Sequence, residues 1–348
     1  ELEGGKYESQ YIAVSSTLWN KITSAVYDEN GDAVVEGVKY KRLSRKDAKY
    51  ARFGDSDYYE WGDDIVRYFK YESIKWRVLD VNGTDVLLLA DKGLDDREYN
   101  TSFKSITWGK STIRSWLNGY DSSVNTYGTD YSRKNFIDAA FTSSERSAIK
   151  TIEVVNEDNI SFGTEGGNNT SDKIFLLSEK EVYNSSTALS YGFIKNRARH
   201  DEARRCKSST YAKATGVHSD TDNSYIGDCD WWLRSPGGFD NLAAVVGSNS
   251  YVYGSGVLVD YDLYAVRPAL HLDLSASGIY RYAGTVCSDG SENSSHESSK
   301  SSCGGVNEYF TQPEGPVSKK KESGHTIKRL KKVIAILLAV AIACIAMI

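Results

Sequence analysis

The sequence predicts a mixed α+β fold, made of short strands with two or more short helices. Three observations predict it: a β-hairpin pattern over residues 74–90, a capped amphipathic stretch at 111–118, and short glycine-broken strands between 231 and 272. The 348 residues are 40% hydrophobic and 26% charged, which is enough apolar material for one large or two modest domains. This composition excludes a disordered or fibrous chain.

The first part of the chain is expected to form strands. Residues 1–34 are polar and aromatic with weak periodicity and are interpreted as a lead-in, and one or two short strands are predicted at 34–43. Residues 74–79 alternate between apolar and polar side chains, and the Asn82-Gly83 pair that follows favours a tight turn. Because 85–90 continues as an apolar run, we predict a β-hairpin.

Helix signals follow the hairpin. Ser111 is a capping residue, the apolar side chains of 113–117 share one face, and Gly119 favours termination, so a helix is predicted at 111–118. A second helical stretch is predicted at 136–140.

Two capping boxes predict further helical turns. Thr142 is followed by Glu145 and Ser178 by Glu181, the second pair coming after a predicted strand at 173–177. Residues 202–215 also look helical and carry Arg204, Arg205 and Lys207 close together. A solvated helix face is the favoured interpretation of these charges, over an anion site.

Two motifs near the end of the folded region differ in kind from the rest. WWLRSP (231–236) pairs two large aromatic side chains with an arginine, and VRPAL (266–270) carries a second arginine. Adjacent tryptophans bury a large area, and both arginines suit a buried ion pair or bonds to backbone carbonyls. We interpret the motifs as a structural framework formed by Trp231, Trp232, Arg234, Arg267 and Pro268.

The segment between the motifs is interpreted as a displayed binding face. The chain holds 24 tyrosines, and tyrosine, serine and asparagine make adaptable contact surfaces, although tyrosine is also typical of strands. His271, on a predicted strand, is interpreted as a packing residue. The candidate ligand-binding residues are Asp240, Asn241, Ser248, Asn249, Tyr251, Tyr253, Asp260, Tyr261 and Tyr264.

Charge and motif spacing argue against several functional classes. Outside residues 319–348 the chain is strongly acidic, which repels phosphate backbones, so no nucleic-acid partner is expected. The 109–111 string lacks the first glycine of a phosphate-binding loop, no nucleophile elbow is present, and the five histidines are scattered. We therefore expect no catalytic residue, metal ion or cofactor. Carboxylates are plentiful, so a glycoside hydrolase stays an alternative with no residue pair singled out.

The C-terminal region changes character. Residues 286–326 are predicted to form a serine-rich and basic linker, and 327–348 an apolar tail that resembles a membrane anchor or a signal sequence. Membrane association is expected through the apolar residues 333–348, although basic residues before them favour a cytoplasmic position for the body. In an oxidising compartment, a disulfide between Cys287 and Cys303 is one option, the other being free thiols.

Several strings together carry a resemblance to a known group of proteins. Residues 68–79, 94–100, 108–118, 231–237 and 266–270 resemble a family of uncharacterised bacterial surface domains found in Firmicutes. That family is similar in fold to C-type lectins, formylglycine-generating enzyme and the variable proteins of diversity-generating retroelements. The resemblance implies a C-type-lectin-like domain over 35–285, with a variable ligand-binding segment at 238–265.

The resemblance also sets expectations for function. It implies a non-catalytic domain at the bacterial cell surface or envelope that binds a protein or a glycan. The enzyme relatives bind copper through a cysteine pair, whereas Cys206 and Cys229 lie outside the framed segment, and the calcium-dependent sugar motifs of C-type lectins are absent from the sequence. A degenerate enzyme of the formylglycine-generating type and a structural envelope module are the remaining alternatives.

Overall fold

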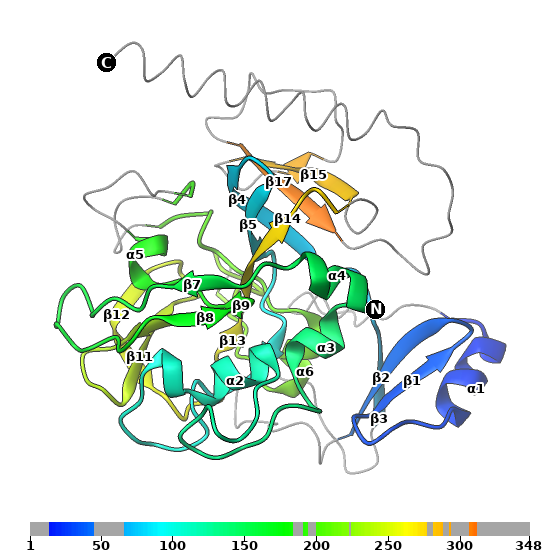
Figure 1. Ribbon diagram of the computed structural model, residues 1–348. Coiled ribbons are helices and arrows are strands. Elements are labelled where there is room, and N and C mark those ends of the chain that lie inside the picture. Colours follow the sequence, from blue (N-terminus) through cyan, green and yellow to red (C-terminus); the bar gives the residue numbers. More distant parts are fainter. Residues whose placement is uncertain are drawn as a thin grey trace.

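A computed structural model describes residues 14–44, 66–183, 191–193, 200–222 and 224–276, together with the backbone of three later strands. The predicted mixed α+β class is confirmed: within these residues, several largely antiparallel sheets are joined by short helices (Figure 1). The large body and a small N-terminal lobe lie beside each other. The two larger sheets each combine strands that lie far apart in the sequence.

The lobe consists of one helix and a three-stranded antiparallel sheet. These elements are α1 (Ser16–Ser24), β1 (Asp32–Val35), β2 (Val38–Ser44) and β3 (Val66–Lys70), in the sheet order β1-β2-β3. Ile22, Val35 and Tyr40 form its small core. The lobe packs against the body through Phe69, whose ring meets that of Tyr211 edge-on at 5.4 Å.

The largest sheet has the order β16-β15-β17-β4-β5-β14-β9. Its strands are β4 (Lys75–Asn82), β5 (Asp85–Ala90), β9 (Ile174–Phe175), β14 (Ala269–Asp273), β15 (Arg281–Cys287), β16 (Glu292–Asn293) and β17 (Val306–Thr311). The predicted hairpin is confirmed as β4–β5, and Gly83 has the positive φ of 63° that its turn needs. Strand β17 comes from the predicted linker and pairs with β4, so part of the serine-rich region belongs to the sheet.

The second sheet carries both framework motifs. It has the order β12-β11-β10-β13-β6, formed by β6 (Asp95–Asp96), β10 (Trp231–Pro236), β11 (Leu242–Val246), β12 (Val252–Leu258) and β13 (Ala265–Val266). Strand β10 is buried along its whole length and runs parallel to β13, with Trp231 opposite Ala265. A separate ribbon pairs β7 (Ile152–Val154) with β8 (Thr170–Asp172).

Three of the short helices, α2, α4 and α5, begin at the predicted caps Ser111, Thr142 and Ser178. The short helices of the body are η1 (Trp108–Lys110), α2 (Thr112–Asn118), α3 (Phe136–Ala140), α4 (Ser143–Ala148), α5 (Glu179–Val182) and α6 (Thr210–Thr215). Ser111 accepts a hydrogen bond from the Arg114 backbone, and Gly119 ends α2 with φ +71°. Both predicted capping boxes are present, at the starts of α4 and α5.

The prediction of a helix at 202–215 is wrong over most of that range. Only α6 is helical, because residues 206–208 pair with 227–229 instead and the helix begins after Ser209. The solvated charged face is also wrong. Arg204 is fully buried and donates to the Ser250 carbonyl at 2.9 Å, and Arg205 forms an ion pair with Asp228.

His271 lies on strand β14, where its imidazole is stacked on Phe175 at 6.1 Å and bonds to Asp85 at 2.8 Å. Lys150 contacts the same carboxylate at 2.6 Å. Burial alone would raise the pKa of Asp85, but these two partners lower it below its ordinary value.

The pairs around Asp85 are expected to make stability depend on pH. Since the folded-state pKa is lowered, their contribution is present above the ordinary aspartate pKa of about 4 and is lost as pH falls through the lowered value. Asp85→Asn is therefore expected to reduce the free energy of unfolding by on the order of 1 kcal/mol at pH 5 and by less at pH 2.5. Denaturant titrations at the two pH values measure this, and an equal loss at both would contradict it.

No helix within the described ranges is long and apolar enough to cross a membrane. The predicted tail 327–348 and Cys303 lie outside those ranges.

Candidate functional site

The framework tryptophans lie at the centre of the second sheet. Both indoles are fully buried, and each N–H has a partner: Trp231 donates to the Arg204 carbonyl at 3.2 Å, and Trp232 to the Arg97 carbonyl at 2.8 Å. A buried indole whose N–H is bonded adds area and direction without an unsatisfied donor. The two side chains therefore fix β10 to segments far away in the sequence.

The framework arginines form both kinds of contact that the sequence suggested, an ion pair and hydrogen bonds to backbone carbonyls. Arg234 forms a two-pronged ion pair with Glu181, at 2.5 and 3.1 Å, and also donates to the carbonyls of Leu176 and Val155. Arg267 donates to backbone carbonyls and lies 4.8 Å over the Trp231 ring. The Pro268 carbonyl accepts the backbone N–H of Ala90, which joins β13 and β14 to β5.

The predicted binding residues are divided between the two ends of the β11–β12 hairpin. Asp240 and Asn241 precede β11, and their carbonyls accept hydrogen bonds from Ile106 and Val259. Asp260 directly follows Val259 at this end, and its Oδ1 is buried without a hydrogen-bond partner among the described residues. Ser248 lies seven residues from Asn241, about 20 Å along the strand at roughly 3.3 Å per residue. The structure therefore does not bring all nine residues together.

A second group does come together, at the 247–251 turn. Ser248 bridges two carboxylates: its hydroxyl donates to Asp220 and its backbone N–H to Asp230, each at 2.7 Å. Asn249 donates to the Tyr253 hydroxyl at 2.7 Å. A Cβ on Gly247 would lie 2.6 Å from the Tyr253 ring, so glycine is needed for that ring to lie over the turn.

The 259–264 loop, which runs from the Asp260 end back to Asp230, adds two tyrosines: Tyr264 directly, and Tyr261, whose backbone N–H bonds to the Leu258 carbonyl, only through its electrostatic interaction with Tyr264. Tyr264 packs on Trp232 with ring centroids 4.7 Å apart, and burial raises its pKa to about 12, with smaller contributions from Asp230 and Tyr261. We call this group the tyrosine face. Its residues are Asp220, Asp230, Ser248, Asn249, Tyr253, Tyr261 and Tyr264.

The turn below the face is anchored to the body. Ser250 is fully buried with φ +66°, and its hydroxyl accepts the Asp201 backbone N–H at 2.8 Å. Tyr251 is half-buried and closes the turn, because its backbone N–H donates to Asn249 and its carbonyl accepts from Gly247. Tyr251 therefore supports the turn that carries the face.

The electrostatics of the face are set by its two acids. Burial raises the pKa of Asp230, the negative charge of Asp220 adds to this, and Ser248 and His218 oppose it. Sequence reasoning missed both acids. Asp230 immediately precedes the WWLRSP motif, and this position is a sequence signal that could have identified it. Asp220 joins the site through tertiary contact alone.

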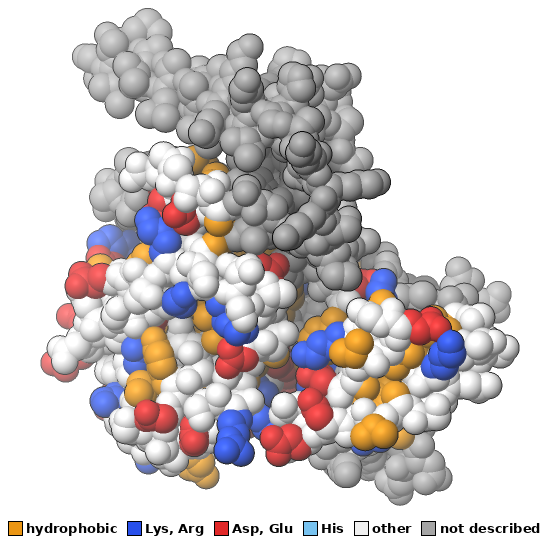
Figure 2. Space-filling model, turned by 45° about the vertical axis from the view of Figure 1, so that its right-hand side comes forward, with side chains coloured by type: hydrophobic (Ala, Val, Ile, Leu, Met, Phe, Trp, Pro, Cys, Tyr) orange, Lys and Arg blue, Asp and Glu red, His pale blue; other side chains and the backbone are white. Residues whose placement is uncertain are grey.

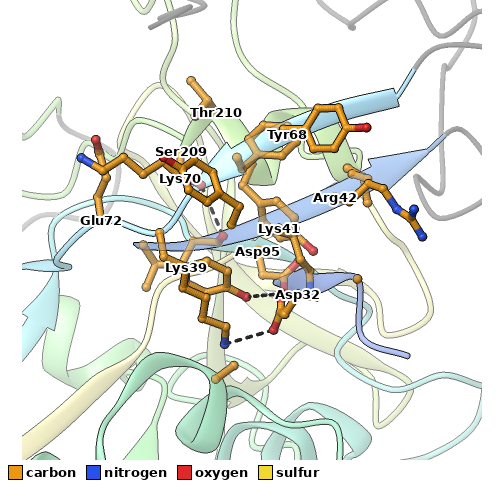
Figure 3. A pocket seen from close by; sticks show the side chains of 18 of the residues that line it. Asp32, Lys39, Lys41, Arg42, Tyr68, Lys70, Glu72, Asp95, Ser209 and Thr210 are labelled. Carbon is orange, nitrogen blue, oxygen red and sulfur yellow. Dashed lines mark hydrogen bonds and ion pairs between the residues drawn. The ribbon is translucent and has the colours of Figure 1, made fainter. Parts of the chain in front are cut away.

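A large cleft forms a second candidate site. It has a volume of about 2140 Å³ and lies between the lobe and the body, with basic side chains outnumbering acidic ones along its walls. Figure 2 shows the lobe standing beside the body, and Figure 3 shows Lys39 directed at Asp32 inside the cleft. Lys39, Lys41 and the Tyr71 hydroxyl all contact Asp32, at 3.0–3.2 Å. Lys39 and Lys41 are therefore paired with Asp32, so the cleft exposes fewer unpaired charges than its composition suggests.

Within the described ranges, no group of three or more histidine, cysteine, aspartate or glutamate side chains is placed to hold a metal ion.

These features define a mixed α+β domain in which a buried Trp-Arg framework carries a polar, tyrosine-rich face. Residues 83–274 match the family described as a domain of unknown function, DUF6273, and the chain belongs to this family. The match includes both framework motifs and the whole tyrosine face. No curated protein and no solved structure matches the chain.

Proposed function

We propose that this protein is a non-catalytic recognition protein that binds a protein or glycan ligand through the tyrosine face. The observation that carries the proposal is the exposure of two tyrosines: Tyr253, 42% exposed and bonded to Asn249 of the turn, and Tyr261, 45% exposed on the loop that leads to Tyr264. Rigid aromatic side chains lose little rotamer freedom on binding, and neighbouring carboxylate and amide groups bond to hydroxyl or amide ligands. The fully buried framework beneath them limits reorganisation on binding.

The resemblance found in the sequence supports the same proposal at finer detail. It suggests a C-type-lectin-like arrangement, a variable segment at 238–265 and a position at the bacterial cell surface or envelope. The tyrosine face draws five of its seven residues from that segment. Asp240, Asn241 and Asp260, at the other end of the hairpin, are assigned to a separate edge of the binding surface.

The proposal is tested by ligand capture on a glycan array and by pull-down of bacterial surface proteins. The full chain is used, because β17 pairs with β4 and a chain cut at residue 285 would lose that strand. The double variant Tyr253→Ala/Tyr261→Ala is expected to weaken a captured ligand by about tenfold or more, since aromatic contacts concentrate binding energy.

Tyr127→Ala is the matched control, because Tyr127 is 52% exposed and lies outside the face. It is expected to bind like the wild type. Unchanged capture by the double variant at equal thermal stability would place recognition elsewhere. Absence of capture by any of the proteins would favour the structural envelope module.

One observation favours a second candidate, a glycoside hydrolase. Asp220 and Asp230 bond to the same serine, and burial beside another acid raises the pKa of Asp230, as in sites where one carboxyl keeps its proton. The two functions differ in their response to Asp230→Asn. A hydrolase would lose turnover of a chromogenic glycoside by orders of magnitude, whereas a recognition protein shows no turnover in either form.

A further inference from the structure

Two buried thiols lie opposite each other on neighbouring backbone segments. Residues 206–208 run antiparallel to 227–229, with Lys207 paired to Asp228. The Cys229 N–H donates to the Cys206 carbonyl at 2.7 Å, and the Ser208 N–H donates to the Gly227 carbonyl at 3.3 Å. Because these bonds flank the 207–228 pair, Cys206 and Cys229 occupy directly opposite positions.

This register brings the two side chains within reach of each other. Opposite residues at such a position have Cα atoms about 5.5 Å apart and side chains on the same face of the pair. A disulfide requires a Cα separation of about 4.4 to 6.8 Å. The Cys229 Sγ already lies 3.2 Å from the Cys206 carbonyl oxygen, and both cysteines are buried as free thiols.

A buried positive charge acts on the same pair. Arg267 is fully buried, donates to two backbone carbonyls, and has an Nη2 without a hydrogen-bond partner in the described part of the chain. None of the described carboxylates forms an ion pair with it. A buried cation without a counter-charge is costly, and a thiolate at Cys206 would reduce that cost.

The two thiols differ in acidity. Burial alone would raise the pKa of Cys206, but a hydrogen bond from Cys229 and the charge of Arg267 lower it below its ordinary value. Burial and the contact with Cys206 raise the pKa of Cys229. An acidic thiol beside a protonated one is the arrangement of an attacking and a resolving cysteine.

We propose that Cys206 and Cys229 form a redox-active dithiol that closes to a reversible disulfide behind the tyrosine face. A low-molecular-weight disulfide such as oxidised glutathione is the oxidant, and it reaches Cys206, which is 2% exposed, when the surrounding backbone opens locally. The Cys206 thiolate attacks one of its sulfurs, the S–S bond breaks, and one glutathione thiolate leaves. The Cys229 sulfur then attacks the Cys206 sulfur and displaces the second glutathione. The proton of Cys229 goes to one departing glutathione thiolate, and the other takes up the proton that Cys206 released to solvent on ionising, so the dithiol loses two electrons and the oxidant becomes two thiols.

The position of the pair connects it to the face. Cys229 forms a β-bridge with Ser219, and the next residues along the two segments are Asp230 and Asp220. Both acids of the tyrosine face therefore follow directly from this bridge. Closing the disulfide fixes the backbone that holds them.

The test begins with the full reduced chain incubated with oxidised or reduced glutathione under native conditions, and with chain refolded in oxidised glutathione. Remaining thiols are alkylated, and the peptides are mapped by mass spectrometry. We expect a peptide pair cross-linked between Cys206 and Cys229 in the oxidised samples, reversed by dithiothreitol. The cross-link is expected to raise the thermal midpoint by roughly 5 °C, because it closes a long loop in the unfolded chain.

Single variants test the assigned roles. Cys229→Ser is expected to accumulate a glutathione adduct on Cys206, whereas Cys206→Ser leaves Cys229 without one. Cys287→Ser is the control and keeps the 206–229 cross-link. The proposal is overturned if both cysteines of the wild type stay alkylatable after refolding in oxidised glutathione, or if either is found linked to Cys287, Cys303 or Cys344 instead.

Discussion

Replacing Trp231 by alanine is expected to lower the free energy of unfolding by about 3–5 kcal/mol. The side chain is 0% exposed, lies under the Arg267 guanidinium at 4.8 Å and donates its N–H to the Arg204 carbonyl. Alanine removes the apolar contacts of the indole and leaves a cavity beside β10, and both changes lower the free energy of unfolding. Since domains have about 5–15 kcal/mol of stability, this loss is a large share of the total.

Denaturant titration of the full chain measures this loss. Trp19→Ala is the matched control, because Trp19 is 46% exposed on α1 and makes one edge-on contact with Tyr68 at 5.5 Å. It is expected to cost less than about 1 kcal/mol. Equal losses in the two variants would show that the Trp-Arg framework does not stabilise the domain.

Replacing Asp172 by alanine is expected to have an effect of similar size. This fully buried carboxylate on β8 accepts hydrogen bonds from Arg114 at 2.8–3.0 Å, Trp108 at 3.1 Å, Tyr120 at 3.0 Å and Thr170 at 2.7 Å. It thus joins η1 and α2 to the β7–β8 ribbon. Its removal leaves Arg114 buried without its counter-charge, which costs about 3–5 kcal/mol.

The comparison variants for Asp172 separate charge from shape. Asp172→Asn keeps the volume but loses the ionic contact, so an intermediate loss is expected. Lys21→Ala breaks the exposed pair Lys21–Glu36, whose side chains are about half exposed, and is expected to cost no more than about 1 kcal/mol. If Asp172→Ala is as mild as Lys21→Ala, the buried network does not stabilise the fold.

The features predicted correctly from the sequence are those held by short-range hydrogen bonds. Ser111 and Gly119 delimit α2 as predicted, and the capping boxes at Thr142 and Ser178 are both formed. Each of these features depends on hydrogen bonds between residues within four or five positions, so the local sequence contains all the partners. The same reason explains the correct hairpin at Gly83.

The candidate site, in contrast, depends on contacts between residues far apart in the sequence. The sequence pointed to the 239–264 segment, but the pairing of β11 with β12 sends Asp240 and Asn241 to one end and Ser248 and Asn249 to the other. The register of the β11–β12 pair decides which residues share an end of the hairpin. The segment is rich in Asp, Asn, Ser and Tyr throughout, so its composition does not distinguish the two ends. Asp220, 28 positions from Ser248, carried no signal of its own.

The mixed α+β class, the local turns and helix ends, and the two motifs that form the framework all follow from the amino-acid sequence. Long-range packing is the reason that residues 202–209 are not helical, that Arg204 is buried, that β17 joins the main sheet and that Cys206 faces Cys229. The physical reason is that backbone groups and buried charges must find partners, and here the partners lie tens to hundreds of positions away. Such partners are chosen by the packing of the whole domain, which no local pattern contains.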